Sequence, residues 1–424
     1  MRGMMMRLVI AAFVLAGWAS QSIETAQEQF ARLQKQAAEA KKAGEHAARV
    51  AAVVELAKML HHSPAVVMSE ARVYAEGNEN ERALAALKEF VDMGQTDDAM
   101  LQGKAAQFAA LQEMPRYQAI LDQMKASESA VQRGETAFSL KDAGVLAEDM
   151  DYDPSSRGFL MTSVLEKKIV RVSEKGEITD FAKSPHGWSM MAIKVDTVRG
   201  QVWATESAID GFSNVAKEDW GRSEVLCLDL KTGAVRQRID GGKRALGDMA
   251  LMPSGEPIVS DGEGGGVYRV KDGKLALING RDFISPQTPA MLADGKHALV
   301  PDYVRGIGSL DLETGDVRWV NEEGGAALSG VDGVYVAQDA MLLTQNGTTP
   351  ERVMRMRTKD SWTRVTTQDV IERGPELGDP THGVVVGEWF YYIANSGWDK
   401  LDEHGDVKPG MKMSPARVMR FRLK

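Results

Sequence analysis

The chain has 424 residues, with 51 basic and 60 acidic side chains and a net charge of −9. This length suits two or three domains. Lys and Arg form no basic run or stripe, which argues against a nucleic-acid partner.

Residues 1–19 have the pattern of a secretory signal peptide. Arg2 and Arg7 precede the apolar segment "LVIAAFVLAGWA", about a dozen residues long, and Gly17 and Ala19 supply small side chains before a cleavage point. The alternative is a short membrane anchor, although the segment is short for a bilayer span. No other segment reaches transmembrane length, so we expect a periplasmic or secreted protein with no membrane span after cleavage.

The chain has one cysteine, Cys227, so it forms no internal disulfide. Cys227 lies in the alternating stretch "SEVLCLDL", which predicts a small buried side chain.

Residues 22–132 have helical periodicity. Gly44, Gly77 and Gly94 interrupt the pattern where helices are expected to stop. In "ARVYAEGNENERALAALKEF", Tyr74 and Ala83 have the spacing of a tetratricopeptide repeat. We therefore expect a small all-α helical-repeat region, which either packs as an appendage or docks a protein partner.

From residue 135 to residue 424 the period changes to two, and short strands recur in groups of four about every 40 to 55 residues. Six such groups predict an all-β six-bladed propeller. The sixth group lacks its fourth strand at the chain end. "ETAFSLKD", which precedes the first group, can supply that strand and close the ring without a bare sheet edge.

The first strand of each propeller blade lines the central channel, so the residues that begin these strands converge at one mouth. These residues are Glu148, Asp149, His186, Trp188, Asp248, Gln287, Asp332, Asp379 and His382. Carboxylates gathered with an amide suit a hard cation such as calcium, which takes six to eight oxygen ligands. A bound cation would also offset the repulsion between the adjacent carboxylates of Glu148 and Asp149. Tyr303, Trp188 and Trp398 are candidates for a pocket wall or for packing at the sheet edges.

The mouth motifs resemble those of the six-bladed lactonases, namely the gluconolactonase and regucalcin group and, more distantly, the paraoxonases. Glu148 and the Asp332–Gly333 pair in "GVDGVYV" match gluconolactonase positions. "AEDM" and the His186 motif "SPHGWS" match paraoxonase positions, and Asp248 in "LGDMAL" matches a further metal-side position. The likeness spans most of residues 146–424 through motifs of two to four residues.

Three positions depart from these families. Gln287 and Gly247 stand where the families have Asn, and Glu206 stands where the paraoxonases have a second His. The first two departures weaken the expected ligand set, because a Gln carbonyl is held less rigidly and Gly offers no side-chain ligand.

The resemblance implies a metal-dependent hydrolase of lactones or related esters. Its metal, calcium or alternatively zinc, would be held by Glu148, Asp149, Asp248, Gln287 and Asp332. Asp332 would be the general base in the gluconolactonase version and His186 in the paraoxonase version, with His382 assisting. The alternative is a non-catalytic binding propeller whose helical region docks a partner at the cell envelope, because fold alone does not decide function.

Overall fold

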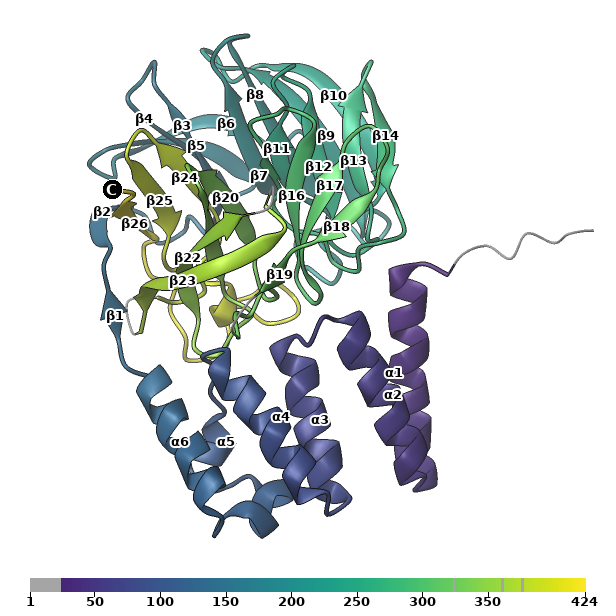
Figure 1. Ribbon diagram of the computed structural model, residues 1–424. Coiled ribbons are helices and arrows are strands. Elements are labelled where there is room, and N and C mark those ends of the chain that lie inside the picture. The colour runs from purple at the N-terminus through teal and green to yellow at the C-terminus, as the bar shows by residue number, and fades with distance from the viewer. Residues whose placement is uncertain (1–23, 323–324, 360–361, 375–376) are drawn as a thin grey trace, which may run out of the picture.

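The computed structural model describes residues 24–322, 325–359, 362–374 and 377–424. The predicted signal segment, residues 1–19, lies outside them. The described chain folds as a six-bladed β-propeller preceded by a helical segment (Figure 1). None of its helices combines the length and the apolar character needed to cross a membrane.

The helical segment consists of consecutive packed helices. They are α1 (Ala26–Ala43), α2 (His46–Met59), α3 (Pro64–Glu76), α4 (Asn80–Asp92), α5 (Asp98–Leu101), the 3-10 helix η1 (Ala106–Leu111) and α6 (Pro115–Ser127). Helix α1 begins with a capping box between Thr25 and Glu28, and it ends at Gly44, whose φ of 73° is left-handed. Tyr74 and Ala83 are buried between α3 and α4. The tetratricopeptide assignment remains a prediction.

Each blade is an antiparallel sheet in which consecutive strands pair. Blade one comprises β3 (Ala147–Asp153), β4 (Gly158–Ser163), β5 (Lys168–Ser173) and β6 (Ile178–Lys183), and blade two comprises β7 (Ser189–Asp196), β8 (Gln201–Ser207), β9 (Arg222–Asp229) and β10 (Val235–Lys243). Blade three comprises β11 (Leu246–Leu251), β12 (Pro257–Asp261), β13 (Val267–Lys271) and β14 (Lys274–Asn279). Blade four comprises β15 (Ala290–Met291), β16 (His297–Asp302), β17 (Gly306–Asp311) and β18 (Val317–Trp319). The last two comprise β20 (Gly333–Ala337), β21 (Ala340–Gln345), β22 (Arg352–Lys359) and β23 (Arg364–Arg373); and β24 (Gly383–Val386), β25 (Trp389–Ile393) and β26 (Arg417–Arg422).

The ring closes as the sequence predicts. Strand β2 (Glu135–Ser139) pairs antiparallel with β26 and supplies the fourth strand of the sixth blade. Two short strands were not predicted: β1 (Val131–Gln132) and β19 (Asn321–Glu322) both pair with the outer strand β23 of the fifth blade. They cover the edge of β23 that would otherwise be unpaired.

The helical segment packs against the propeller face on which the channel mouth lies (Figure 1). Gln27 donates to the carbonyl of Ile284 at 2.8 Å, Arg305 donates to the carbonyl of Met59 at 3.1 Å, and the Thr96 amide donates to the carbonyl of Thr349 at 2.7 Å. Ile284 lies in the loop before β15, Arg305 in the turn between β16 and β17, and Thr349 in the loop between β21 and β22. The sequence does not predict this placement.

Two long loops cover the mouth face over the other blades. The loop after β8 meets the loop between β25 and β26, where the Ser213 amide donates to the carbonyl of His404 at 2.9 Å. The rings of Phe212 and Trp398 lie 6.3 Å apart. We call these two loops, residues 208–221 and 396–416, the clasp.

Candidate functional site

A small cavity of about 280 Å³ opens at the channel mouth. It is lined by Glu148, Ser285, Gln287, Tyr303, Asp332, Asn346, Asp379, Thr381 and Trp398. The residues that the sequence placed at the mouth therefore do meet in part, although they come from different blades. Tyr303 and Trp398, two of the three proposed wall residues, also face this cavity.

His382 contacts residues of two other blades at the mouth. Its Nδ1 lies 2.7 Å from the backbone carbonyl of Glu148, and its Nε2 lies 3.1 Å from Oδ1 of Asp248. Because a carbonyl only accepts, Nδ1 carries a proton and Nε2 faces the carboxylates. Thr288 also donates to Asp248 through its hydroxyl.

Two carboxyl groups of this site have pKa values close to neutrality. Burial raises the pKa of Glu148 to about 8, and the nearby charges of Asp332 and Asp248 add to this effect. Burial likewise raises the pKa of Asp332 to about 7, with Asp248 and Asp379 contributing. Their polar partners are the Trp398 indole N–H, which donates to Glu148, and the Asn346 amide, which donates to Asp332 at 3.2 Å.

The pKa of His382 is raised well above its ordinary value. Burial acts in the opposite direction, but Asp332 and the hydrogen bond to Asp248 outweigh it. An imidazolium at this place balances part of the buried negative charge.

Asp149 has different partners from its neighbour Glu148. Its Oδ2 accepts from the Lys194 ammonium at 2.6 Å and from the Ile193 amide at 2.8 Å, and its Oδ1 accepts from the Met150 amide at 2.8 Å. A lysine rather than a metal therefore explains how this carboxylate is tolerated, and Asp149 does not line the mouth cavity.

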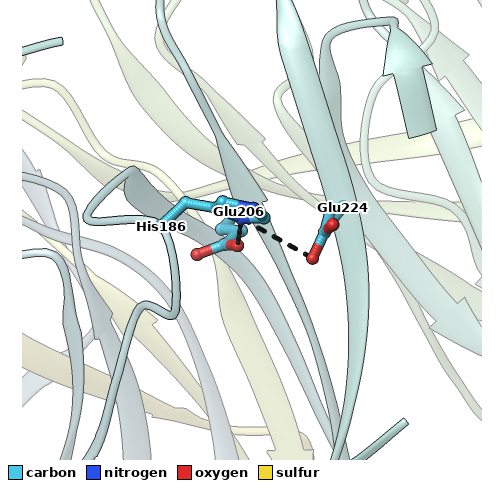
Figure 2. Close-up of side chains that lie close together, drawn as sticks. All are labelled: His186, Glu206 and Glu224. Carbon is cyan, nitrogen blue, oxygen red and sulfur yellow. Dashed lines mark hydrogen bonds and ion pairs between the residues drawn. The ribbon is translucent and has the colours of Figure 1, made fainter. Parts of the chain in front are cut away.

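His186 lies in a second cluster, with Glu206 of β8 and Glu224 of β9 (Figure 2). Its Nδ1 is 2.7 Å from Oε1 of Glu206 and 3.7 Å from Oε2 of Glu224, and its ring stacks on Trp188 at 4.2 Å. Arg238 contacts both His186 nitrogens and donates to Glu224 at 2.8 Å. The guanidinium already supplies a cation there, and His186 does not join the mouth cavity as the paraoxonase version requires.

Two tests bear on a divalent cation at the mouth. The donors fit in kind, since Glu148, Asp248 and Asp332 offer carboxylates, and His382, held by a backbone carbonyl, offers Nε2 once its imidazolium loses a proton. The spacing is wider than a preformed site needs: in the described part of the chain, only His186, Glu206 and Glu224 bring three such ligand atoms within 4.8 Å of one another. A divalent cation can therefore bind at the mouth only if the carboxylate oxygens move closer to one another.

Asp302 supports the loops of the mouth from outside the cavity. The Asp302 carboxylate accepts from the amides of Ile284 and Ser285 and from those of Val304 and Arg305. It thus supports the loops that carry Gln287 and Tyr303. Thr288 and Thr381 were missed, although Thr381 directly precedes His382 and shares its motif.

No family model and no curated protein matches the chain. Solved structures do match. An oxidoreductase (glucose dehydrogenase) of Thermus thermophilus is 16% identical, with a TM-score of 0.48, over 69% of this chain and 99% of that one. The aldose sugar dehydrogenase of Streptomyces coelicolor is 15% identical, with a TM-score of 0.48, over 69% and 99%.

Regucalcin of Agrobacterium tumefaciens, a calcium-binding protein, is 15% identical, with a TM-score of 0.45, over 69% of this chain and 95% of its own. These likenesses carry no information on the activity of this chain. The propeller itself is established by the strand pairing described above.

Proposed function

We propose that the mouth is a hydrolytic site for lactones or related esters. The observation that carries the proposal is the pair of buried carboxyls, Glu148 and Asp332, which face one cavity with pKa values of about 8 and about 7. An acid and a base are most effective when their pKa values lie near the working pH.

In this proposal Asp332 is the general base. Its carboxylate removes a proton from water, and the water oxygen attacks the ester carbonyl carbon. The bond from that carbon to the alkoxy oxygen then breaks, and the protonated carboxyl of Glu148 donates its proton to the leaving oxygen. Asn346 holds Asp332 and Trp398 holds Glu148 through the hydrogen bonds described above.

In the metal-bound alternative to this proton transfer, a divalent cation, calcium or zinc, would be held by Glu148, Asp248 and Asp332 as carboxylates and by His382 after loss of its Nε2 proton, with Gln287 on the cavity wall. When bound, it would polarise the ester carbonyl as a Lewis acid. The imidazole nitrogen in the donor set favours zinc over calcium, because calcium prefers an all-oxygen set.

The test is a panel of lactones and esters assayed with the wild type, Asp332→Asn, Glu148→Gln and the exposed clasp variant Glu403→Gln. We expect each mouth variant to lose at least a hundredfold in kcat/KM, which is the usual size of a general acid–base contribution, while Glu403→Gln keeps wild-type activity. A bell-shaped pH profile should lose one limb in each mouth variant. Turnover that survives in both mouth variants would end the proposal.

The second candidate is a binding propeller without turnover. The wide spacing of the mouth carboxylates, with an imidazole already among them, favours it. Saturable binding of a panel member without any turnover, unchanged by chelator, would support this candidate over the hydrolase.

We also propose that the protein is exported, on the strength of the signal pattern in residues 1–19. Sequencing the N-terminus of the protein from the extracytoplasmic fraction tests this. A mature chain beginning near residue 20 is expected, and an intact Met1 in the cytoplasm would contradict it.

A further inference from the structure

A groove of about 630 Å³ runs between the helical segment and the propeller. We call it the helix groove. One of its walls is a single face of α1, with side chains at helical spacing: Phe30, Gln34, Ala37, Ala38 and Lys41. From Phe30 to Lys41 the helix rises about 16 Å, so the groove is long and narrow.

The other two sides are faces of α2 and α3. Helix α2 contributes Arg49, Val53 and Leu56, and α3 contributes Ser69 and Arg72. Because α2 runs antiparallel to α1, with Met59 bonded to the propeller, Leu56 lies near the propeller and Arg49 lies far from it. The volume is within the range of small-molecule sites.

The propeller end of the groove adjoins the mouth. Tyr303 lines both the helix groove and the mouth cavity, and its hydroxyl donates to Asn346 at 3.0 Å. Gly347 is required beside it, since a Cβ there would lie 2.7 Å from the Tyr303 ring. Tyr303 therefore forms part of the wall that the two spaces share.

The two ends of the helix groove differ in charge. Near the propeller the lining is apolar, with Phe30, Leu56 and Val66. At the far end it carries Lys41, Arg49 and Arg72. Arg49 pairs with Glu76 and Arg72 pairs with Asp97, so Lys41 is the cation at this end that no described acid neutralises.

We propose that the helix groove binds the non-reacting part of the mouth's substrate, an extended apolar chain that ends in an anionic group. The inference rests on the proposed function. The acidic mouth repels a carboxylate and the far end of the groove attracts it, so the charges orient the chain with its ester at Glu148 and Asp332. The substrate class is an ester or lactone with a long apolar arm and a distal carboxylate.

The test uses two matched pairs on α1. Ala38→Trp fills the helix groove, and its control is Ala31→Trp on an exposed turn outside the groove. Lys41→Glu reverses the charge at the far end, and its control is the neighbouring Lys42→Glu. All four sites are surface positions or groove edges, and melting curves check that each variant folds.

The substrates are monomethyl hexadecanedioate, whose chain is long enough to reach from the mouth to Lys41, its dimethyl ester and methyl butyrate. Wild type should prefer the monomethyl ester in kcat/KM. Ala38→Trp should lower that value at least tenfold, and Lys41→Glu should lower it about threefold to tenfold, the scale of an exposed charge contact. Neither should change methyl butyrate turnover, and both controls should match wild type. Equal values for the groove variants and their controls would overturn the inference.

Binding of hexadecanedioic acid monoamide, measured by calorimetry, separates the two proposals. If no ester is hydrolysed but the monoamide binds and Ala38→Trp weakens it at least tenfold, the helix groove stands and the hydrolase fails. If methyl butyrate is hydrolysed while the monoamide does not bind, the hydrolase stands and the helix groove fails.

Discussion

The imidazole of His382 lies between Asp248 and the backbone of Glu148, with Nε2 3.1 Å from the Asp248 carboxylate and Nδ1 2.7 Å from the Glu148 carbonyl. His382 comes from the start of the last blade and Asp248 from the third. The contact therefore spans the channel and links two blades that are distant in sequence. It also places a cationic side chain where the sequence suggested a metal.

Replacing His382 should destabilise the fold most at low pH. Its pKa is raised in the folded state, so its stabilisation is present below the unfolded value of about 6.5 and is lost as pH rises through the folded value. We expect His382→Gln to cost about 3 kcal/mol at pH 6, measured by urea unfolding, and less at pH 9. His404→Gln, at an exposed histidine of the clasp, is the control. An equal loss at both pH values would contradict this assignment of charge.

Glu148→Gln should have a pH signature of the same sign, because the folded pKa of Glu148 is also raised. The folded pKa of Glu148 is about 8, above its unfolded value, so the folded state binds more protons and wild-type stability falls as pH rises through this window. The variant should therefore gain at least about 1.4 kcal/mol relative to wild type at pH 9 compared with pH 5. Unfolding curves across this range measure it, with Glu403→Gln as control. A flat difference between the curves would show that the carboxyl ionises normally.

The propeller was predictable because its evidence is periodic. Each blade repeats an alternation of apolar residues with a turn at the same place, and an unpaired edge strand at the chain end demands a partner. The pairing of β2 with β26 follows from that demand. The docking of the helices was not predictable, because it depends on single contacts such as Gln27 with Ile284 that leave no periodic trace.

The candidate site was only partly predictable. Ring closure gathers Glu148, Gln287 and Asp332 around one cavity, as expected from their places at strand starts. Strand β3 has a register shift between Ala147 and Met150, so regular alternation does not set the directions of Glu148 and Asp149, and Asp149 meets Lys194 instead of the cavity. His186 precedes its strand in a loop, where no alternation fixes direction, and it turns to Glu206.

Lys194→Met should be strongly destabilising, because it leaves Asp149 buried without its counter-ion. The Asp149 side chain is 1% exposed and that of Lys194 is 15% exposed. Breaking a buried ion pair costs about 3 to 5 kcal/mol, whereas replacing both partners by apolar residues costs much less. Urea unfolding of Lys194→Met, Asp149→Leu and the double variant forms a cycle that measures the coupling. Additive losses in the double variant would mean that the contact stabilises nothing.

Arg352→Met should loosen the helical segment from blade five. The Arg352 guanidinium is buried, which lowers its pKa to about 10 but leaves it charged at neutral pH. It donates to the Met93 carbonyl at 2.9 Å, where the end of α4 is partially negative, and to Gln345 at 2.8 Å. The variant loses these stabilising hydrogen bonds, but it also loses the unfavourable burial of a charge. Because the two effects oppose each other, the free energy of unfolding is a poor readout. Amide exchange at Thr96, whose N–H bonds to Thr349, reports the docking directly.

That amide should exchange at least tenfold faster in Arg352→Met, equivalent to about 1.4 kcal/mol of docking free energy, while amides within blade one keep wild-type rates. Arg355→Met is the matched control, because Arg355 lies on the same strand but pairs with Asp369 away from the helices. Unchanged exchange at Thr96 in Arg352→Met, or an equal increase in the control, would show that the apolar contacts of Ala327 with α3 and α4 hold the helices without this arginine.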